Sequence, residues 1–111
     1  MKTIDRETLE TALRSSEPPI LLEALPEKYF RDGHLPGAKH FPHDQVRALA
    51  PTLLPRRDRG VVVYCASDTC RNSHIAAQEL TRLGYADVSV YAGGKKDWES
   101  SGRALEKTEA G

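Results

Sequence analysis

Residues 61–71 read Val-Val-Val-Tyr-Cys-Ala-Ser-Asp-Thr-Cys-Arg, and this stretch decides the fold. Its first four residues form an unbroken, mostly β-branched run, which is typical of a central parallel strand covered on both faces. The small polar residues that follow predict a loop. A helix is expected next over residues 72–83, with Gly84 as the residue that ends it. Cys65 is therefore expected at the carboxyl end of a buried strand.

The expected helix over residues 72–83 has one apolar side. Its inner face should consist of Ile75, Ala76, Leu80 and Leu83. A loop that leads into a helix directs free N–H groups inward, and the helix amino terminus adds partial positive charge. Both features stabilise an anion, so we expect a lowered pKa and high reactivity for the Cys65 thiol. The alternative is that Cys65 is only a small buried apolar residue.

The rest of the chain alternates in the same way. Strands are expected at residues 20–22, 38–41 and 87–91. Helices are expected at residues 3–14, 26–30 and 45–50, and around Trp98 after a Gly-Gly turn. Asp44 is the expected N-cap of the helix at 45–50, which should end near Pro51, and the polar tail from Gly102 should be frayed. This order predicts an α/β fold with a mainly parallel central sheet flanked by helices on both faces.

Length and composition predict one soluble domain spanning residues 1–111. Sixteen basic residues balance sixteen acidic ones, so the chain lacks the net positive charge expected of a protein that binds nucleic acid or an anionic membrane. No apolar stretch approaches the roughly 18 residues of a membrane-spanning helix, and the first residues do not read as a secretory signal. Only two cysteines occur, which is a poor disulfide framework. We therefore expect a cytoplasmic protein in a reducing compartment.

Four segments together resemble the rhodanese superfamily. Residues 61–65 with the following loop and helix resemble its active-site strand, and Leu-Leu-Glu at 21–23 with Gly-His-Leu-Pro-Gly-Ala at 33–38 resembles its amino-terminal signature. Residues 83–91 resemble the strand after the active-site helix. Gly-Gly at 93–94 with Trp98 resembles the carboxyl-terminal motif. The resemblance covers residues 3–103, nearly the whole chain.

The resemblance implies a rhodanese fold and a sulfurtransferase. Cys65 would be the catalytic nucleophile, carrying sulfane sulfur as a persulfide from a thiosulfate- or persulfide-type donor to a thiophilic acceptor such as cyanide or a protein thiol. The backbone of the loop would stabilise the bound sulfur group. The expected substrate-binding residues are Ala66, Ser67, Asp68, Thr69, Cys70 and Arg71. No cofactor, nucleic acid or membrane partner is implied.

Two departures from the family pattern matter. The family usually has Asp-x-Arg where this chain has Glu23-Ala24-Leu25, so the arginine is missing. The loop from Cys65 through Arg71 has seven residues, where single-domain relatives commonly have six, and it contains a second cysteine. Seven residues from Cys to Arg also resemble the phosphate loop of cysteine phosphatases and arsenate reductases. Tyr64 in place of histidine, and a carboxylate at Asp68 that would repel a dianion, argue against this alternative.

Cys70 has two possible roles. It could be a resolving cysteine that attacks a sulfenate or persulfide on Cys65 and forms a disulfide, or it could pack inward as a structural residue. The alternative to a sulfurtransferase is a non-catalytic binding module that presents Cys65 to a partner protein as a redox or persulfide sensor. Turnover separates the two, because a sensor would accept one sulfur and release it slowly.

The remaining polar residues favour structural interpretations. No metal site is expected, because two cysteines in one loop do not complete a tetrahedron and the histidines lie on different elements. These histidines are His34, His40, His43 and His74. His34 is interpreted as a hydrogen-bonding residue that stabilises its loop, and His74 as a solvated helix residue rather than a general base. Ser73 could cap its helix or contact the bound sulfur, and capping is the favoured interpretation.

Overall fold

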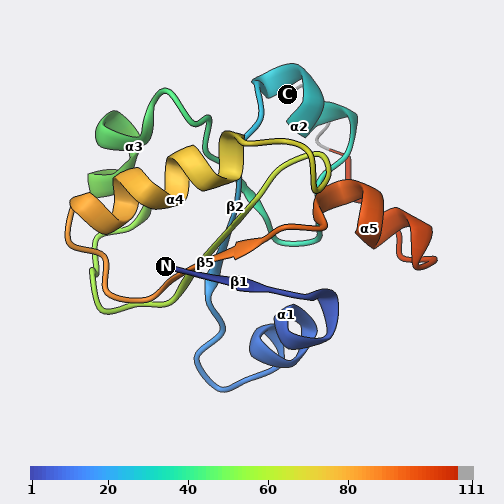
Figure 1. Cartoon of the computed structure of the whole chain (residues 1–111), viewed down its shortest axis with the longest axis horizontal. Coiled ribbons are helices and arrows are strands. Elements are labelled where there is room, and N and C mark those ends of the chain that lie inside the picture. The colour runs from blue at the N-terminus through green and yellow to red at the C-terminus, as the bar shows by residue number, and fades with distance from the viewer. Residues whose placement is uncertain (108–111) are drawn as a thin grey trace.

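A parallel sheet forms the centre of the computed structural model, which describes residues 1–107 of the 111-residue chain. Its strands are β1 (Lys2–Ile4), β2 (Ile20–Glu23), β3 (Lys39–His40), β4 (Val61–Tyr64) and β5 (Val88–Tyr91). The five strands lie in the order β1-β5-β4-β2-β3, and all neighbours are parallel (Figure 1). The expected α/β class with a parallel sheet is confirmed.

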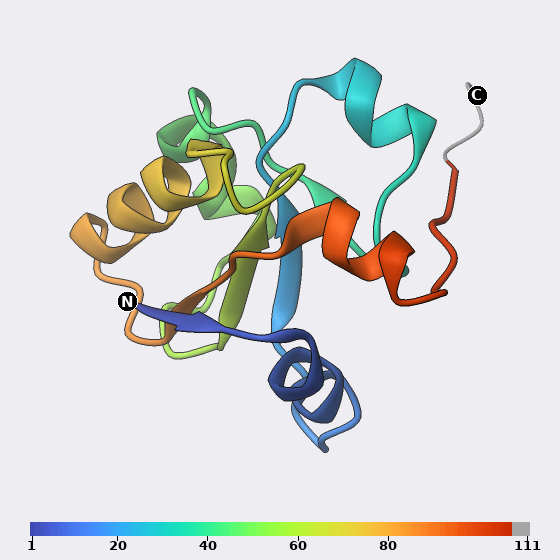
Figure 2. The ribbon, with the colours of Figure 1, turned by 45° about the vertical axis from the view of Figure 1, so that its right-hand side comes forward.

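Helices cover both faces of the sheet, as expected. They are α1 (Arg6–Leu13), α2 (Glu27–Asp32), α3 (Val46–Leu53), α4 (Asn72–Arg82) and α5 (Gly94–Ser100). Figure 2 shows α3 and α4 on one side of the sheet and α1 and α5 on the other. Each face has its own apolar core, centred on Ala50 and Leu80 on the first side and on Leu9 and Trp98 on the second. Within residues 1–107, no helix is long and apolar enough to cross a membrane.

The central strand β4 is covered on both faces. All of its residues are buried, and Val63 pairs with Leu22 of β2 on one side and Val90 of β5 on the other. The unbroken β-branched run therefore has the position that its composition predicted. The chain leaves the sheet at Cys65 and enters α4 at Asn72, in agreement with the expected loop and helix.

The expected helix over residues 3–14 is wrong at its beginning. Lys2–Ile4 instead forms the edge strand β1, in which Thr3 pairs with Val90 of β5. The side chain of Asp5 accepts a hydrogen bond of 2.8 Å from the Thr8 N–H and so caps α1. This cap separates an extended segment from the helix, because the N-cap residue itself has extended backbone geometry.

Helix α3 also departs from expectation. Asp44 is not its N-cap: Gln45 precedes the first turn, and no side chain caps it. The helix does not end near Pro51 but continues to Leu53. Proline removes only its own hydrogen bond to the preceding turn, and the ladder resumes with Leu54 N–H donating to the Ala50 carbonyl at 2.8 Å. Ala50 and Leu54 are both fully buried, and this packing keeps the last turn in place.

The inner face of α4 differs from the expected one. Ile75 is 46% exposed, and the buried positions of the helix are Ser73, Ala76, Ala77 and Leu80. These positions follow the i, i+3, i+4, i+7 spacing of a single helix stripe, and Ile75 lies outside it. Small residues dominate this stripe, and they allow the helix to pack closely on the sheet.

The segment after α5 is ordered on the fold through residue 107, so the expected fraying from Gly102 is wrong there. Glu106 and His34 exchange two backbone hydrogen bonds of 2.8 Å, and the Trp98 indole N–H donates to the Ala104 carbonyl at 3.1 Å. Leu105 packs against the core on this side of the sheet. Residues 108–111 lie outside the described part of the chain.

Candidate active site

Cys65 is the first residue after β4, and its side chain is only 1% exposed. The amino-terminal end of α5 holds the peptides on either side of Ala66: Lys95 N–H donates to the Cys65 carbonyl at 3.0 Å, and Lys96 N–H donates to the Ala66 carbonyl at 2.9 Å. In a trans peptide the carbonyl and the following N–H point in opposite directions. The N–H groups of Ala66 and Ser67 therefore face away from α5.

Glycine is required where α5 meets this loop. Gly94 has a φ of +62°, and a Cβ at this position would collide with the Cys65 carbonyl oxygen. Both the left-handed backbone and the close approach exclude other residues. The Gly-Gly motif thus lets α5 approach the backbone of Cys65 closely enough for the hydrogen bonds from residues 95 and 96.

The sulfur of Cys65 contacts the first turn of α4. Ser73 Oγ lies 3.4 Å from Cys65 Sγ, and Ser73 is 1% exposed. The Ser67 carbonyl oxygen lies 4.0 Å from the sulfur on the loop side. The N-cap of α4 is Arg71, with no side-chain capping bond, so the interpretation of Ser73 as a cap is wrong. Ser73 instead contacts the sulfur.

The expected lowering of the Cys65 pKa is not found. Burial raises the pKa of the Cys65 thiol, and the neighbouring Cys70 thiol raises it further, whereas hydrogen bonds from the side chain and backbone of Ser73 lower it. A carbonyl dipole, that of Ser67, points at the sulfur on the side where amide groups were expected. A carbonyl accepts a hydrogen bond from a thiol and does not stabilise a thiolate, so the free site favours the protonated cysteine.

The loop places its predicted substrate-binding residues around Cys65. Ser67 and Cys70 are half-buried and close a turn, in which Cys70 N–H donates to the Ser67 carbonyl at 3.1 Å. The hydroxyls of Ser67 and Thr69 lie 3.0 Å apart. The exposed residues of the loop are Ala66, Asp68, Thr69 and Arg71. Their contact with substrate remains a prediction.

A buried acid lies beneath the loop. Glu23, at the end of β2, is fully buried, and the Tyr64 hydroxyl donates to its Oε1 at 2.8 Å while accepting the Leu35 N–H at 3.0 Å. Lys95 Nζ lies 3.0 Å from Oε2. Burial raises the pKa of Glu23, and its contacts with Lys95 and Tyr64 lower it. Leu25, two residues after the acid, is buried, and the cation that pairs with Glu23 comes from α5.

Sequence reasoning noted Glu23 but missed Lys95. The two residues are 72 positions apart, and no periodic pattern joins them. The only local signal is the position of Lys95 directly after the Gly-Gly turn, on the first turn of a helix that packs at the carboxyl ends of the strands. Tyr64 was considered only as a departure from phosphatases, yet its hydroxyl joins β4 to β2 and to the loop at Leu35.

Two of the four histidines, His34 and His40, have structural contacts. His34 Nδ1 lies 2.9 Å from the Phe30 carbonyl, and its ring stacks on Phe30 with centroids 4.0 Å apart, which confirms its role in stabilising the loop. His40 Nε2 lies 2.7 Å from the Leu25 carbonyl. Among residues 1–107, no group of three or more His, Cys, Asp or Glu side chains is arranged to hold a metal ion.

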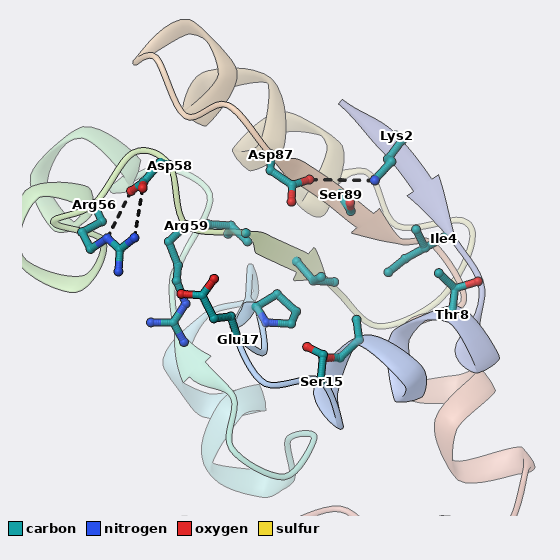
Figure 3. Close-up of a pocket in the computed structure, with 15 residues that line it drawn as sticks. Lys2, Ile4, Thr8, Ser15, Glu17, Arg56, Asp58, Arg59, Asp87 and Ser89 are labelled. Atoms are coloured by element: carbon teal, nitrogen blue, oxygen red, sulfur yellow. Dashed lines mark hydrogen bonds and ion pairs between the residues drawn. The ribbon is translucent and has the colours of Figure 1, made fainter.

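A cavity of about 330 Å³ lies at the other end of the sheet (Figure 3). Its walls include Lys2 of β1, Val61 of β4 and Ser89 of β5, together with Arg59 and Asp87 from the connections before the strands. Val61 begins β4 and Cys65 follows its end, about 13 Å further at 3.3 Å per residue. The cavity is therefore separate from the cysteine, which lies at the carboxyl edge, where ligands of parallel α/β sheets usually bind.

The sequence and the fold match known proteins. Residues 5–101 match the family described as Rhodanese-like domain. The chain is 31% identical over 86 residues to thiosulfate/3-mercaptopyruvate sulfurtransferase 1, mitochondrial, of Arabidopsis thaliana, which covers 66% of this chain and 22% of that protein. It is 36% identical over 73 residues to the thiosulfate sulfurtransferase PspE of Escherichia coli K12, covering 66% of each.

A solved structure agrees with these relatives. The thiosulfate sulfurtransferase of Pseudomonas aeruginosa superposes with a TM-score of 0.85 at 28% identity, over 96% of this chain and 20% of that one. The chain thus spans only about a fifth of the two longer proteins, and less than two thirds of PspE. The family match covers strands β2 to β5, the Cys65 loop and helices α1 to α5, and it begins directly after β1. This chain belongs to the rhodanese-like domain family.

Proposed function

We propose that this protein is a sulfurtransferase that moves sulfane sulfur from a thiosulfate- or persulfide-type donor to a thiophilic acceptor through a persulfide on Cys65. The observation that carries the proposal is the position of Cys65, at the carboxyl end of β4 with its sulfur 3.4 Å from the Ser73 hydroxyl on the first turn of α4. The named sulfurtransferases among its relatives support the same chemistry.

The reaction would proceed in two displacements. The Cys65 thiolate attacks the sulfane sulfur of the donor, a new S–S bond forms, and the donor's S–S bond breaks with its electron pair leaving on sulfite or on a thiolate. The acceptor, a thiolate or cyanide, then attacks the terminal sulfur of the persulfide. The bond between the two sulfurs breaks, and the Cys65 thiolate is regenerated without any net oxidation.

Cys65 must lose its proton before the first displacement, because burial and Cys70 favour the thiol in the free site. Ser73 supplies the groups that oppose this effect, its hydroxyl and its N–H. The N–H groups of Ala66 and Ser67 face away from α5, because that helix holds the carbonyls of Cys65 and Ala66. These groups would stabilise first the thiolate and then the negative terminal sulfur of the persulfide.

Intact-mass measurement tests the proposal. After incubation with thiosulfate or glutathione persulfide, the wild type should gain the mass of one sulfur atom on Cys65, and cyanide should remove it as thiocyanate. Cys65→Ser should gain none, whereas the matched Cys70→Ala variant should still gain one. Sulfur found only on Cys70, or full activity in Cys65→Ser, would show that the nucleophile is assigned wrongly.

Cys70 favours a second candidate, a redox or persulfide sensor. It is half-buried and close enough to Cys65 to raise the pKa of the Cys65 thiol, and both cysteines are free thiols. This arrangement would let a modified Cys65 be captured as a disulfide instead of passing its sulfur on. Steady-state thiocyanate production separates the candidates, because an enzyme turns over many times whereas a sensor stops after about one sulfur per chain.

A further inference from the structure

We propose that Lys95 is a positioning residue for Cys65 and acts through its ion pair with Glu23. The inference rests on the proposed function for its effect on sulfur transfer. Its effect on the cysteine itself is measured independently of any sulfur donor. Lys95 acts on the cysteine through the backbone, because its N–H binds the carbonyl of Cys65.

Lys95 links three parts of the active-site end of the fold. Its backbone N–H donates to the Cys65 carbonyl at 3.0 Å. Its Nζ lies 3.0 Å from Glu23 Oε2 at the end of β2, and it donates to the Tyr29 carbonyl of α2 at 2.7 Å. The Lys95 side chain is 13% exposed, so the pair is shielded from solvent and weakly screened. One residue thus fixes α5 against the cysteine, the neighbouring strand and α2.

Glu23 extends this link to the other side of the cysteine. Its Oε1 accepts the hydroxyl of Tyr64, the residue directly before Cys65. Its Oε2 lies 3.0 Å from Lys95 Nζ, and this contact lowers the pKa of the Glu23 carboxyl against the raising effect of its burial. The ion pair therefore connects to the cysteine on two sides. Glu23 binds the hydroxyl of Tyr64, which precedes Cys65, and the backbone N–H of Lys95 binds the carbonyl of Cys65 itself.

The consequence for chemistry is orientation. With the carbonyls of Cys65 and Ala66 held by α5, the N–H groups of Ala66 and Ser67 point away from that helix. If α5 shifted because the ion pair was lost, these amides would no longer be fixed for a thiolate or persulfide. Displacements of about 1 Å at a catalytic group cost as much as 100-fold in rate. A loss of about tenfold in sulfur transfer is expected from the weaker disturbance here.

Lys28 provides the matched control. It lies on α2 directly before Tyr29, and its side chain is exposed. A Lys28→Met variant removes a positive charge from the helix that the Lys95 side chain contacts, and it leaves α5 and the Cys65 loop unchanged. It should transfer sulfur at close to the wild-type rate, whereas Lys95→Met should lose about tenfold.

The pH dependence of Cys65 alkylation by iodoacetamide separates positioning from simple charge effects. If Lys95 and Glu23 acted on the thiol only through their charges, Lys95→Met would raise the pKa of Cys65 and Glu23→Gln would lower it. Positioning predicts the same direction for both: slower alkylation with a raised pKa. Opposite shifts would overturn the proposal, and so would equal behaviour of Lys95→Met and Lys28→Met.

The double variant Glu23→Gln/Lys95→Met guards against simple misfolding. It removes both charges, so no unpaired charge stays buried, and it should unfold at a higher urea concentration than Lys95→Met. If Lys95 positions Cys65, the double variant should transfer sulfur at the same rate as each single variant. Both single variants and the double variant break the same Lys95–Glu23 link. Lys95→Arg should restore most of the rate. Recovery of activity together with stability in the double variant would contradict the proposal.

Failure of the proposed function would look different. If the wild type formed no persulfide with any donor, sulfurtransferase activity would be excluded, yet the alkylation profiles would still report on the Lys95–Glu23 link. If the wild type formed the persulfide and all variants at Lys95 and Glu23 matched it in rate and profile, only the positioning role would be lost.

Discussion

The side-chain oxygen of Ser73 lies 3.4 Å from the sulfur of Cys65, and both side chains are buried. The contact joins the residue after β4 to the first turn of α4. Burial and the Cys70 thiol raise the pKa of Cys65, and Ser73 lowers it. Two neighbours of the cysteine therefore act on its proton in opposite directions.

Replacing these neighbours should shift the reactivity of Cys65 in opposite directions. Ser73→Ala should raise the pKa further and slow iodoacetamide alkylation at pH 7 about fivefold, the value of one hydrogen bond of about 1 kcal/mol. Cys70→Ala should lower the pKa and speed the reaction. Mass spectrometry of the Cys65 peptide across pH gives both rates, and the wild-type rate should still rise above pH 9.0, the ordinary value for a thiol. Shifts of the same sign in both variants would contradict the assignment.

Arg71 is the exposed N-cap of α4 and the last residue of the loop. Arg71→Ala should reduce kcat/KM for thiosulfate by the factor that corresponds to a loss of about 1.5–3 kcal/mol in transition-state binding. The reason is that only an anionic donor gains from a guanidinium contact. A neutral alkyl persulfide should lose much less. Arg82→Ala, at the other end of the same helix, is the control and should affect neither donor. Equal losses with both donors would indicate that Arg71 shapes the loop instead.

Local patterns were enough to predict the elements nearest the chemistry. The β-branched run of β4 and the following helix α4 have the positions expected for a buried strand and its crossover, because each of them is set by residues close together in sequence. The short strand β1 could not be found this way. Lys2–Ile4 has no strand-like alternation of its own. It forms a strand because it pairs with the edge of β5, whose residues lie 87 positions further along the chain.

The site was predicted less completely for the same reason. Cys65 and its loop are contiguous, whereas the contacts that set their chemistry come from residues far apart in the chain. Ser73 was interpreted as a cap because serine is a common N-cap. In the structure it follows the cap by two residues and is turned toward the sulfur. The lowered pKa expected from the helix terminus was wrong because burial and Cys70 outweigh Ser73.

Tyr64→Phe tests the hydroxyl that joins β4 to Glu23. The substitution leaves the Leu35 N–H and Glu23 Oε1 buried without their partner. Each of the two unsatisfied groups costs about 1–3 kcal/mol, so the free energy of unfolding should fall by about 2–6 kcal/mol. Urea unfolding should show a lower midpoint with an unchanged m-value. Tyr29→Phe, at a residue 51% exposed, is the control and should leave the midpoint in place.

The segment after α5 should loosen in acid. Arg103 donates two hydrogen bonds to the Glu10 carboxylate of α1, which lower the pKa of Glu10 below its usual 4.5. A lowered pKa in the folded state contributes stability that is present above pH 4.5 and is lost as the pH falls through the folded-state value. Glu10→Gln should therefore be less stable than the wild type at pH 7, and the difference should shrink as the pH falls below 4.5. A difference that is constant across this range would exclude the ion pair as its source.

Cys70 should resolve oxidised Cys65. Peroxide would oxidise the Cys65 thiolate to a sulfenic acid, with water as the other product. The Cys70 thiol would then attack that sulfur, releasing a second water and forming a disulfide. The Cys70 thiol is close enough to raise the pKa of the Cys65 thiol, and the loop that carries Cys70 turns back through the hydrogen bond of 3.1 Å from its N–H to the Ser67 carbonyl.

Comparison of the wild type with Cys70→Ala measures this role. Under mild peroxide the wild type should form a Cys65–Cys70 crosslink, found by peptide mapping, and a dithiol should restore its sulfur transfer. Cys70→Ala should instead accumulate sulfinic acid on Cys65 and stay inactive after the dithiol, because no thiol captures the sulfenic acid first. If both proteins lose activity alike and no crosslink forms, the two side chains do not reach the geometry of a disulfide. Cys70 would then be a structural residue of the loop, and the sensor candidate would lose the observation that favours it.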